Sequence, residues 1–363
     1  MKPTQALHAL GQSLWLDNIT RTLLNDGTLA RYIRDLDITG LTSNPTIFEH
    51  AIGKSDAYDE AIAKLAKEGR SGEALFFELA LQDLTRAAAL FRPVFDSTQG
   101  ADGWVSLEVS PLLAHDGAGT IAAAADLHAR AACPNLFIKI PGTAEGLEAI
   151  EASIFAGIPV NVTLLFSRQQ YQAAANAYLR GIERRIEKGL DPKVRSVASL
   201  FVSRWDVAAN EVLPTPLRNQ IGIAIAQQTW QAWWEIQGSA RWIAAANAGA
   251  HPQRLLWAST GVKDPRASDT MYVENLAAPD TINTMPGATL LGFVDHGRVS
   301  ARMPIEGSEA DETIARCRAA GVDDEELAAR LQIEGAEAFA ASWGKLLDGI
   351  ASKLAVLQPE QAS

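Results

Sequence analysis

Short β-rich runs alternate with longer helical patterns through most of the chain, and each run is bounded by Gly, Pro, Asn or Asp, as strands usually are. The eight runs are Ser13–Ile19, Ile38–Asn44, Trp104–Ser110, Leu136–Pro141, Val160–Phe166, Val197–Ser203, Leu255–Thr260 and, more weakly, Thr281–Met285. Eight β/α alternations in a chain of 363 residues predict an α/β fold with a single (β/α)8 barrel of the TIM type. An open doubly wound sheet is the alternative.

Ala-rich segments with the spacing of amphipathic helices connect the predicted strands. We expect helices over Ser55–Glu68 (with Ser55 as N-cap), from Ser71 to Phe91 and over roughly Arg218–Ala246. Asp323 and Glu326 resemble a capping box, and an amphipathic run then extends to about Leu357. Because no repeat, low-complexity tract or long linker interrupts the chain, we expect one domain over residues 1–363, with the barrel over 13–300 and a C-terminal helix over 323–357.

The composition excludes several classes of protein. Hydrophobic residues make up 47% of the chain and charged residues 21%, which is enough apolar material for a large core. The net charge of −11 disfavours nucleic acid and anionic membranes as partners. The amino terminus lacks the apolar core of a signal peptide, and no run reaches the roughly 18 apolar residues of a membrane helix. Cys133 and Cys317 suit a reducing compartment, so we expect a soluble cytoplasmic protein.

Polar side chains interrupt six of the predicted strands. They are Asp17, Thr42 and Asn44, Glu108, Lys139, Asn161 and Thr163, and Ser199, with Arg204 just beyond the sixth strand. Each alone has a structural explanation, such as an ion pair or a satisfied buried group. Together they are harder to explain in this way, because one unpaired buried charge costs several kcal/mol, on the order of the whole stability margin. Active sites of barrels lie at the carboxyl ends of the strands, so this set predicts one site.

The residue types of this set indicate a chemistry. Lys139 lies between Ile138 and Ile140, and burial disfavours the ammonium form of a lysine and frees its amine as a nucleophile. Two carboxylates can divide the acid and base roles between them. Asn, Ser and Thr suit a polyhydroxylated substrate, and Arg204 suits a phosphate. The combination predicts Schiff-base aldol chemistry on a sugar phosphate.

Other chemistries lack their sequence signatures. The six histidines are scattered without ligand spacing, so we expect no metal. There is no G-x-S-x-G elbow for a catalytic serine, and no glycine-rich nucleotide loop follows a strand. These absences disfavour a catalytic serine and a bound nucleotide.

Three motifs, in order along the chain, resemble those of the transaldolases. They are Leu41–Phe48 (LTSNPTIF), Phe137–Leu147 (FIKIPGTAEGL) and Gly157–Ser167 (GIPVNVTLLFS). The resemblance covers nearly the whole chain, whose length is similar to that of the longer bacterial members. It implies a class I aldolase-type barrel of the pentose phosphate pathway, without metal or organic cofactor. The reaction it implies moves a dihydroxyacetone unit from sedoheptulose 7-phosphate to glyceraldehyde 3-phosphate, giving erythrose 4-phosphate and fructose 6-phosphate. Some relatives carry a fused glucose-6-phosphate isomerase domain, and since this chain ends at Ser363 we expect the transaldolase alone.

The resemblance also implies a role for each matching residue. Lys139 would form the Schiff base, and Asp17 would remove the hydroxyl proton when the carbon–carbon bond breaks and return it to the acceptor aldehyde. Glu108 and Thr163 would hold the water that relays protons during carbinolamine dehydration. Binding of the hydroxyls and support of the catalytic residues would fall to Thr42, Asn44, Asn161 and Ser199. Arg204 would bind the phosphate.

Two comparisons with relatives bear on the phosphate site and on the exact activity. Shorter members have an arginine after the seventh strand as a second phosphate ligand, whereas here Lys263 is the nearest cation before Arg266, so the second ligand stays open.

A close alternative is an enzyme similar to the fructose-6-phosphate aldolases, which release free dihydroxyacetone. Those relatives tend to have Gln at the position of Glu108 and Tyr at that of Phe201, so both residues favour the transferase.

Two further alternatives are proteins without catalytic activity. A barrel that only binds sugar phosphates would need a damaged lysine or base, and both residues are intact. A helical interaction protein would depend on the tryptophans at helical spacing, Trp230, Trp233, Trp234 and Trp242, which are more typical of a core. A role for them in a subunit interface stays open, and we expect a monomer or a homodimer that acts on sugar phosphates.

Overall fold

Eight parallel strands form a closed barrel in the computed structural model, which describes residues 2–299, 302–305 and 307–357. The strands are β1 (Ser13–Asp17), β2 (Gly40–Thr42), β3 (Trp104–Glu108), β4 (Leu136–Pro141), β5 (Val160–Leu165), β6 (Ser196–Phe201), β7 (Arg254–Ala258) and β8 (Thr281–Met285). Each pairs with the next, and β8 pairs with β1. The predicted (β/α)8 barrel is confirmed, and the weak eighth run is a strand.

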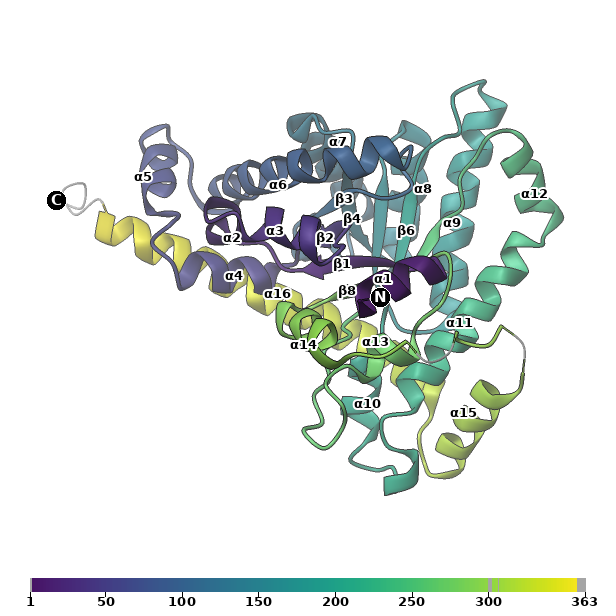
Figure 1. The fold of residues 1–363 in the computed structure, drawn as a ribbon. Helices are drawn as coiled ribbons and strands as arrows, with labels where there is room; N and C mark the ends of the chain where they lie inside the picture. The colour runs from purple at the N-terminus through teal and green to yellow at the C-terminus, as the bar shows by residue number, and fades with distance from the viewer. Residues whose placement is uncertain (1, 300–301, 306, 358–363) are drawn as a thin grey trace.

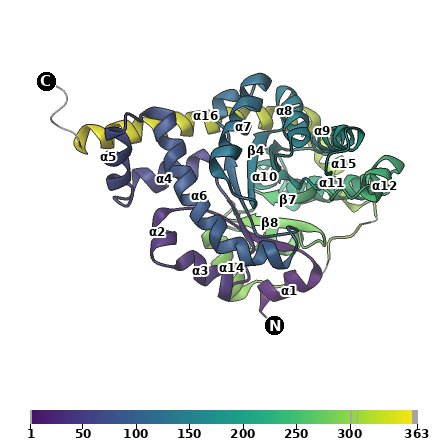
Figure 2. The same cartoon turned by 90° about the horizontal axis from the view of Figure 1, so that it is seen from above.

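Helices surround the barrel and extend beyond it (Figures 1 and 2). In the first half these are α1 (Pro3–Leu10), α2 (Arg21–Asn25), α3 (Thr28–Asp35), α4 (Pro45–Gly53), α5 (Asp59–Lys67), α6 (Gly72–Ser97), the short η1 (Pro111–Leu113), α7 (Gly117–Ala131) and α8 (Ala144–Ala156). In the second half they are α9 (Arg168–Glu187), α10 (Ser203–Ala209), the short η2 (Thr215–Leu217), α11 (Ile221–Gln237), α12 (Ala240–Asn247), α13 (Met271–Asn275), α14 (Gly287–His296), α15 (Glu309–Ala319) and α16 (Asp324–Leu357). The long α16 is the yellow helix that runs past α4 and α5 in Figure 1.

Two of the predicted helices differ from the structure at their ends. The prediction of Ser55 as an N-cap is wrong: its hydroxyl accepts from Ala57 N in a turn, and α5 begins only at Asp59. Helix α6 continues past Phe91 to Ser97, through Pro93. Phe95 in its last turns packs edge-on against Trp104, 5.1 Å between ring centroids, and this contact supports the extra length.

The predicted helix over residues 218–246 is two helices. Helix α11 ends at Gln237, and Ser239 then caps α12 by accepting a hydrogen bond from Trp242 N. A serine hydroxyl competes for backbone donors, which explains the break after Gly238. The carboxyl-terminal prediction is close to the structure, because α16 starts at Asp324 and Asp323 Oδ1 accepts from Glu326 N over 2.9 Å.

Aromatic side chains fill the amino-terminal half of the barrel. Trp15 is fully buried, and Trp104 stacks on Phe137 with 4.0 Å between ring centroids. Gly40 lies between them: a Cβ there would come within 2.6 Å of the Trp15 ring and 2.7 Å of Trp104 O, so only glycine fits. Polar residues follow two positions later on the same face of these strands: Asp17 comes after Trp15, and Lys139 comes after Phe137. The aromatic layer is therefore the floor beneath the polar residues.

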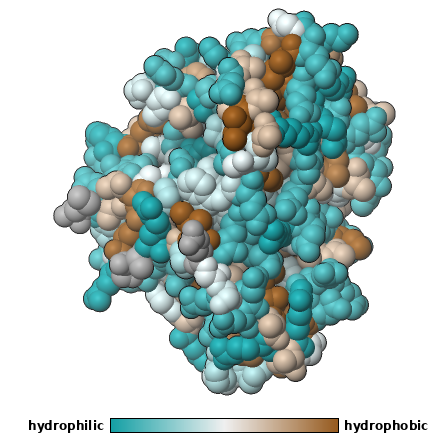
Figure 3. Space-filling view, turned by 90° about the vertical axis from the view of Figure 1, so that its right-hand side faces the viewer, coloured by the Kyte–Doolittle hydropathy of each residue, from teal (hydrophilic) through white to brown (hydrophobic). Residues whose placement is uncertain are grey.

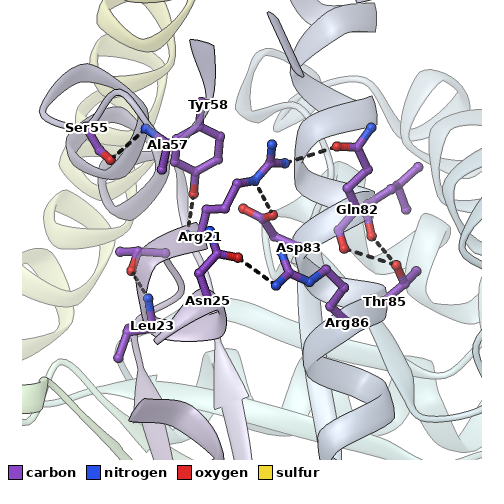
Figure 4. A network of polar contacts seen from close by, with 12 residues as sticks. Arg21, Leu23, Asn25, Ser55, Ala57, Tyr58, Gln82, Asp83, Thr85 and Arg86 are labelled. Carbon is purple, nitrogen blue, oxygen red and sulfur yellow. Dashed lines mark hydrogen bonds and ion pairs between the residues drawn. The ribbon is translucent and has the colours of Figure 1, made fainter. Parts of the chain in front are cut away.

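A buried ion pair joins the first helices outside the barrel (Figure 4). Arg21 Nε donates to Asp83 Oδ1 over 2.9 Å, and Arg21 Nη2 donates to Gln82 Oε1 over 3.1 Å. The Arg21 guanidinium also lies 4.6 Å from the centroid of the Tyr58 ring. Burial raises the pKa of Asp83, and the neighbouring Arg21 opposes that rise. The pair thereby ties α2 to α6 and to the segment before α5.

The tryptophans of α11 and α12 belong to the core. Trp230, Trp233 and Trp242 are buried, and Trp234 is half-buried against Trp233. Figure 3 shows a mainly hydrophilic face with hydrophobic residues in small, separated groups. Core packing, rather than a surface stripe, explains the spacing of these residues.

None of the helices that the structure describes has the length and apolar character needed to span a membrane.

Candidate active site

A cavity of about 240 Å³ opens at the carboxyl ends of the barrel strands. It is lined by side chains from six strands or their following loops and from α16: Asp17, Thr42, Asn44, Thr46, Ile47, Lys139, Ser199, Phe201, Arg204, Ala258, Ser259, Thr284 and Phe339. Seven of the residues predicted from the sequence are on this list. Four others, Glu108, Asn161, Thr163 and Lys263, lie behind or beside the cavity.

Lys139 lies at the base of the cavity with its amine directed by two neighbours. Its Nζ lies 3.1 Å from Glu108 Oε2 and donates to the carbonyl of Ser43 over 3.1 Å. Both side chains of the pair are about 95% buried, and Glu108 is opposite Lys139 in the β3–β4 register. Burial raises the pKa of Glu108, while Lys139 acts in the other direction. The adjacent strands β3 and β4 therefore hold an amine in contact with a carboxyl whose pKa is raised.

Asp17 lies on the wall of the cavity and is held by a chain of hydroxyl groups. Thr42 Oγ1 donates to Asp17 Oδ1 over 2.7 Å, and Thr284 Oγ1 lies 2.7 Å from Thr42 Oγ1. Because the Thr42 hydroxyl has only one proton and gives it to the carboxylate, Thr284 must be the donor to Thr42. Burial raises the pKa of Asp17, and the Thr42 hydrogen bond and Lys139 both oppose the rise.

Asn161 is the centre of a second polar chain across β3, β5 and β6. It donates through Nδ2 to Ser106 Oγ over 3.1 Å, and its Oδ1 accepts from Ser199 Oγ over 2.7 Å. Thr163 is fully buried on the same face of β5, and its Oγ1 has no hydrogen-bond partner among the residues that the structure describes. Glu108 Oε1 is also buried and has no hydrogen-bond partner among the described residues. These two oxygens are free to bind a further group.

Asn44 contributes to the local fold as well as to the cavity. Its Oδ1 accepts from Ile47 N over 3.0 Å and so caps the amino terminus of α4, with Pro45 at the first helical position. The cap fixes where β2 turns into α4, and it places Thr46 and Ile47 on the cavity wall.

Arg204 extends between two aromatic rings at the mouth. Its guanidinium carbon lies 5.2 Å from the centroid of Phe201 and 5.7 Å from that of Phe339. Asp206, two residues further on, does not pair with Arg204, because it accepts from Tyr272 Oη over 2.6 Å and from Gly222 N. Burial lowers the pKa of Arg204, and an arginine nevertheless stays protonated in a protein.

The two candidates for a second phosphate ligand differ in their surroundings. Lys263 lines a larger cleft beside the cavity, and that cleft shares Arg204 and Ser259 with the cavity itself. Arg266 instead forms an exposed ion pair with Asp264, 3.0 Å between Nε and Oδ1. Geometry therefore favours Lys263 over Arg266.

Sequence reasoning missed several residues of the site. Thr284 stands on the weak eighth run, where it follows Ile282 on one strand face, just as Asp17 follows Trp15, and this pattern could have indicated it. Ser106 shares a face of β3 with Trp104 and Glu108 and could have been found in a similar way. Phe339 is far away in the sequence on an amphipathic helix, and no local pattern distinguishes it from a core residue. In the described ranges no group of three or more His, Cys, Asp or Glu side chains is placed to hold a metal.

Comparison with known proteins is consistent with this geometry. Residues 14–350 match the Transaldolase/Fructose-6-phosphate aldolase family. A transaldolase of Arthrobacter sp. (strain FB24) is 43% identical, over 97% of this chain and 98% of the relative. A transaldolase of Thermobifida fusca is 44% identical over 97% and 98%, and transaldolase 2 of Streptomyces coelicolor is 41% identical over 99% and 100%. The chain therefore belongs to the transaldolase/fructose-6-phosphate aldolase family.

Proposed function

We propose that this chain is a transaldolase, a transferase that moves a dihydroxyacetone unit between sugar phosphates through a lysine Schiff base. The donor is sedoheptulose 7-phosphate, the acceptor is glyceraldehyde 3-phosphate, and the reaction belongs to carbohydrate metabolism. One observation carries the proposal: Lys139 Nζ is buried against Glu108 Oε2 at 3.1 Å, in a cavity that also holds Asp17 and Arg204. Full-length relatives named transaldolase support the same activity.

Lys139 is the nucleophile that attacks the ketose carbonyl. Water must then leave the carbinolamine, and this step needs a proton donor next to the nitrogen. Glu108 is suited to that role, because burial raises its pKa and because it touches Lys139. The unpartnered Glu108 Oε1 and Thr163 Oγ1 support a shared water as the relay between them.

Asp17 is the base for cleavage of the carbon–carbon bond. It takes the proton of the hydroxyl on the carbon that leaves as aldehyde, and it returns the proton to the oxygen of the acceptor. Burial raises the pKa of Asp17 above its ordinary value, which makes its carboxylate a stronger base for this transfer. Asp17 and Glu108 are on different strands, which allows the two carboxyls to have different catalytic roles.

The remaining residues bind the substrate or support the catalytic groups. Thr42, Asn44 and Ser199 line the cavity and bind the hydroxyls of the sugar, while Asn161 lies behind them and supports Ser199. Phe201 forms the apolar wall beside them. Arg204 binds the phosphate at the mouth, with Lys263 as the second cation from the adjoining cleft.

Covalent trapping tests the proposal. Incubation with fructose 6-phosphate and borohydride should add one reduced dihydroxyacetone unit to the peptide that contains Lys139. Lys139→Arg should abolish the adduct, since a guanidinium stays protonated and cannot attack a carbonyl. A mass tag on another lysine, such as Lys193 or Lys263, would overturn the assignment.

A coupled assay separates transfer from simple aldol cleavage. A transaldolase needs the acceptor aldehyde, whereas a fructose-6-phosphate aldolase releases dihydroxyacetone without it. Glu108 and Phe201 support the transferase, as expected from the sequence. Rapid release without acceptor would favour the aldolase.

We also propose that the protein acts in the cytoplasm as a monomer or a homodimer. The free thiols of Cys133 and Cys317 support a reducing compartment. Light scattering on the purified protein measures the oligomeric state.

A further inference from the structure

Helix α16 supplies one wall of the catalytic cavity. It packs against α4, α5, α6, η1, β5 and α10, and so spans the carboxyl end of the barrel (Figures 1 and 2). Phe339 near its middle is 4% exposed and lines the cavity. Phe339 thus reaches the reacting groups from more than fifty residues beyond the last strand, because β8 ends at Met285.

Phe339 faces the nitrogen that the Schiff base would use. Lys139 Nζ lies 5.7 Å from the centroid of the Phe339 ring. The ring also lies 6.4 Å from Phe201, centroid to centroid, and 5.7 Å from the guanidinium carbon of Arg204. Phe339 and Phe201 thereby form an apolar surface across the mouth, between the amine and the phosphate-binding arginine.

Three contacts fix α16 in this position. Gln332 Nε2 donates to Gly142 O and Leu164 O, over 3.1 and 2.9 Å, at the ends of β4 and β5. Thr46 Oγ1 and Ser342 Oγ are 2.8 Å apart. At Gly335 a Cβ would lie 3.0 Å from a Leu164 methyl and 3.1 Å from the Arg204 guanidinium, so the absent side chain allows the helix to approach closely.

We propose that Phe339 determines how the enamine intermediate is used: the ring keeps water away from it, so that the acceptor aldehyde takes the dihydroxyacetone unit. This inference rests on the proposed function. Cleavage of the ketose bond passes a hydroxyl proton to Asp17 and leaves an enamine on Lys139 Nζ. In transfer, the enamine carbon bonds to the aldehyde carbon, and the proton of Asp17 goes to the new hydroxyl. Water then hydrolyses the product iminium, which releases the ketose and restores the free amine of Lys139.

The competing route starts from the same enamine. A proton adds to its carbon, water attacks the resulting iminium, and dihydroxyacetone leaves while Lys139 regains its free amine. Both routes end in hydrolysis of an iminium on Lys139, so they differ in the proton that adds to the enamine carbon. Solvent water that would supply this proton must reach the carbon through the mouth of the cavity. An apolar ring over that opening has no group that binds or delivers water, and exclusion of water from an active site suppresses side reactions of this kind.

Two variants and a matched control test the proposal. Phe339→Ala removes the ring, and Phe339→Leu keeps an apolar wall without an aromatic face. Ile333→Ala truncates a side chain on the same helix that is 56% exposed, so it controls for changes in α16 itself. The measured quantity is the ratio of free dihydroxyacetone released to product transferred, with fructose 6-phosphate as donor and erythrose 4-phosphate as acceptor.

We expect this ratio to rise about tenfold or more in Phe339→Ala, which corresponds to about 1.4 kcal/mol between two competing barriers. The ratio should change little in Phe339→Leu and stay at the wild-type value in Ile333→Ala. An unchanged ratio in Phe339→Ala overturns the proposal, and a rise in Phe339→Leu equal to that in Phe339→Ala shows that the aromatic face, rather than exclusion of water, matters.

Failure of this inference is distinguishable from failure of the proposed function. Borohydride trapping on Lys139 of the wild-type protein tests the Schiff base without reference to Phe339. If trapping succeeds and the ratio does not respond, only the role of α16 is wrong. If trapping fails, the proposed function itself is wrong.

Discussion

The hydroxyl of Thr42 holds the proposed base in its charged form, so its removal should shift the pH dependence of catalysis. Thr42 Oγ1 donates to Asp17 Oδ1 over 2.7 Å. Burial raises the pKa of Asp17, while this hydrogen bond and the charge of Lys139 oppose the rise. Thr42→Val keeps the branched shape and the burial but removes the donor. The pKa of Asp17 should therefore rise further.

The size of the shift follows from the strength of the lost contact. A hydrogen bond to a charged group is worth about 1.5–3 kcal/mol, and one pKa unit corresponds to about 1.36 kcal/mol, so the pKa should rise by about one to two units. The other titratable groups near Asp17 are Lys139 and Glu108, and the substitution leaves both in place. Since Asp17 must be ionised to accept a proton, the acid limb of the pH profile should move to higher pH by the same amount.

The assay is kcat/KM for the transfer reaction, which reports ionisations of the free enzyme. Thr42→Ser keeps the hydroxyl and should have the acid limb of the wild type. Thr284→Val removes the donor to Thr42 and should shift the limb in the same direction by less, because it acts through Thr42. The reasoning is refuted if Thr42→Val is folded, by its thermal unfolding, and yet has the acid limb of the wild type.

Four further predictions have definite expected outcomes. Asp17→Ala should still trap the ketose with borohydride while turnover falls about 10²–10⁴-fold, and wild-type turnover would transfer the base role to another residue. Arg204→Ala should lower kcat/KM for phosphorylated sugars about ten- to a hundredfold and leave unphosphorylated sugars unchanged, whereas an equal loss for both would indicate lost stability instead. Asp83→Ala should lower the free energy of unfolding in urea by about 3–5 kcal/mol, because it leaves Arg21 buried without its partner, and the double variant Arg21→Met/Asp83→Leu should lose less if the unpaired charge is the cause. Burial raises the pKa of Asp206 to about 6, so Asp206 should contribute a loss of about 3 kcal/mol of stability as the pH rises from about 4 through 6; Asp206→Asn should lack this contribution, and an equal loss in both proteins would contradict the assignment.

The strands and the polar face of the barrel could be predicted from the sequence. Each strand is short, and its alternation of residues is a local property, so Trp15 followed by Asp17 and Phe137 followed by Lys139 already indicate an apolar floor beneath polar groups. Closure of the barrel then brings these polar groups together. The lysine, the two carboxylates and the arginine were recognisable for that reason.

Helix ends were predicted less well, because they depend on single contacts. Ser55 has the residue type of an N-cap but accepts from Ala57 N in a turn, and Ser239 starts a helix inside a continuous Ala-rich pattern. Whether such a hydroxyl caps a helix depends on which backbone donor lies within reach. Composition alone does not specify that.

Contacts between distant segments required the folded structure. Phe339 reaches Lys139 across two hundred positions of sequence, and Thr284 reaches Thr42 across 242. Asp206, two residues after Arg204, is a nearby candidate for an ion pair, yet it bonds to Tyr272 and leaves the guanidinium at the mouth. Side-chain periodicity encodes which face of an element is buried, but which groups meet across the barrel depends on how all the elements pack together.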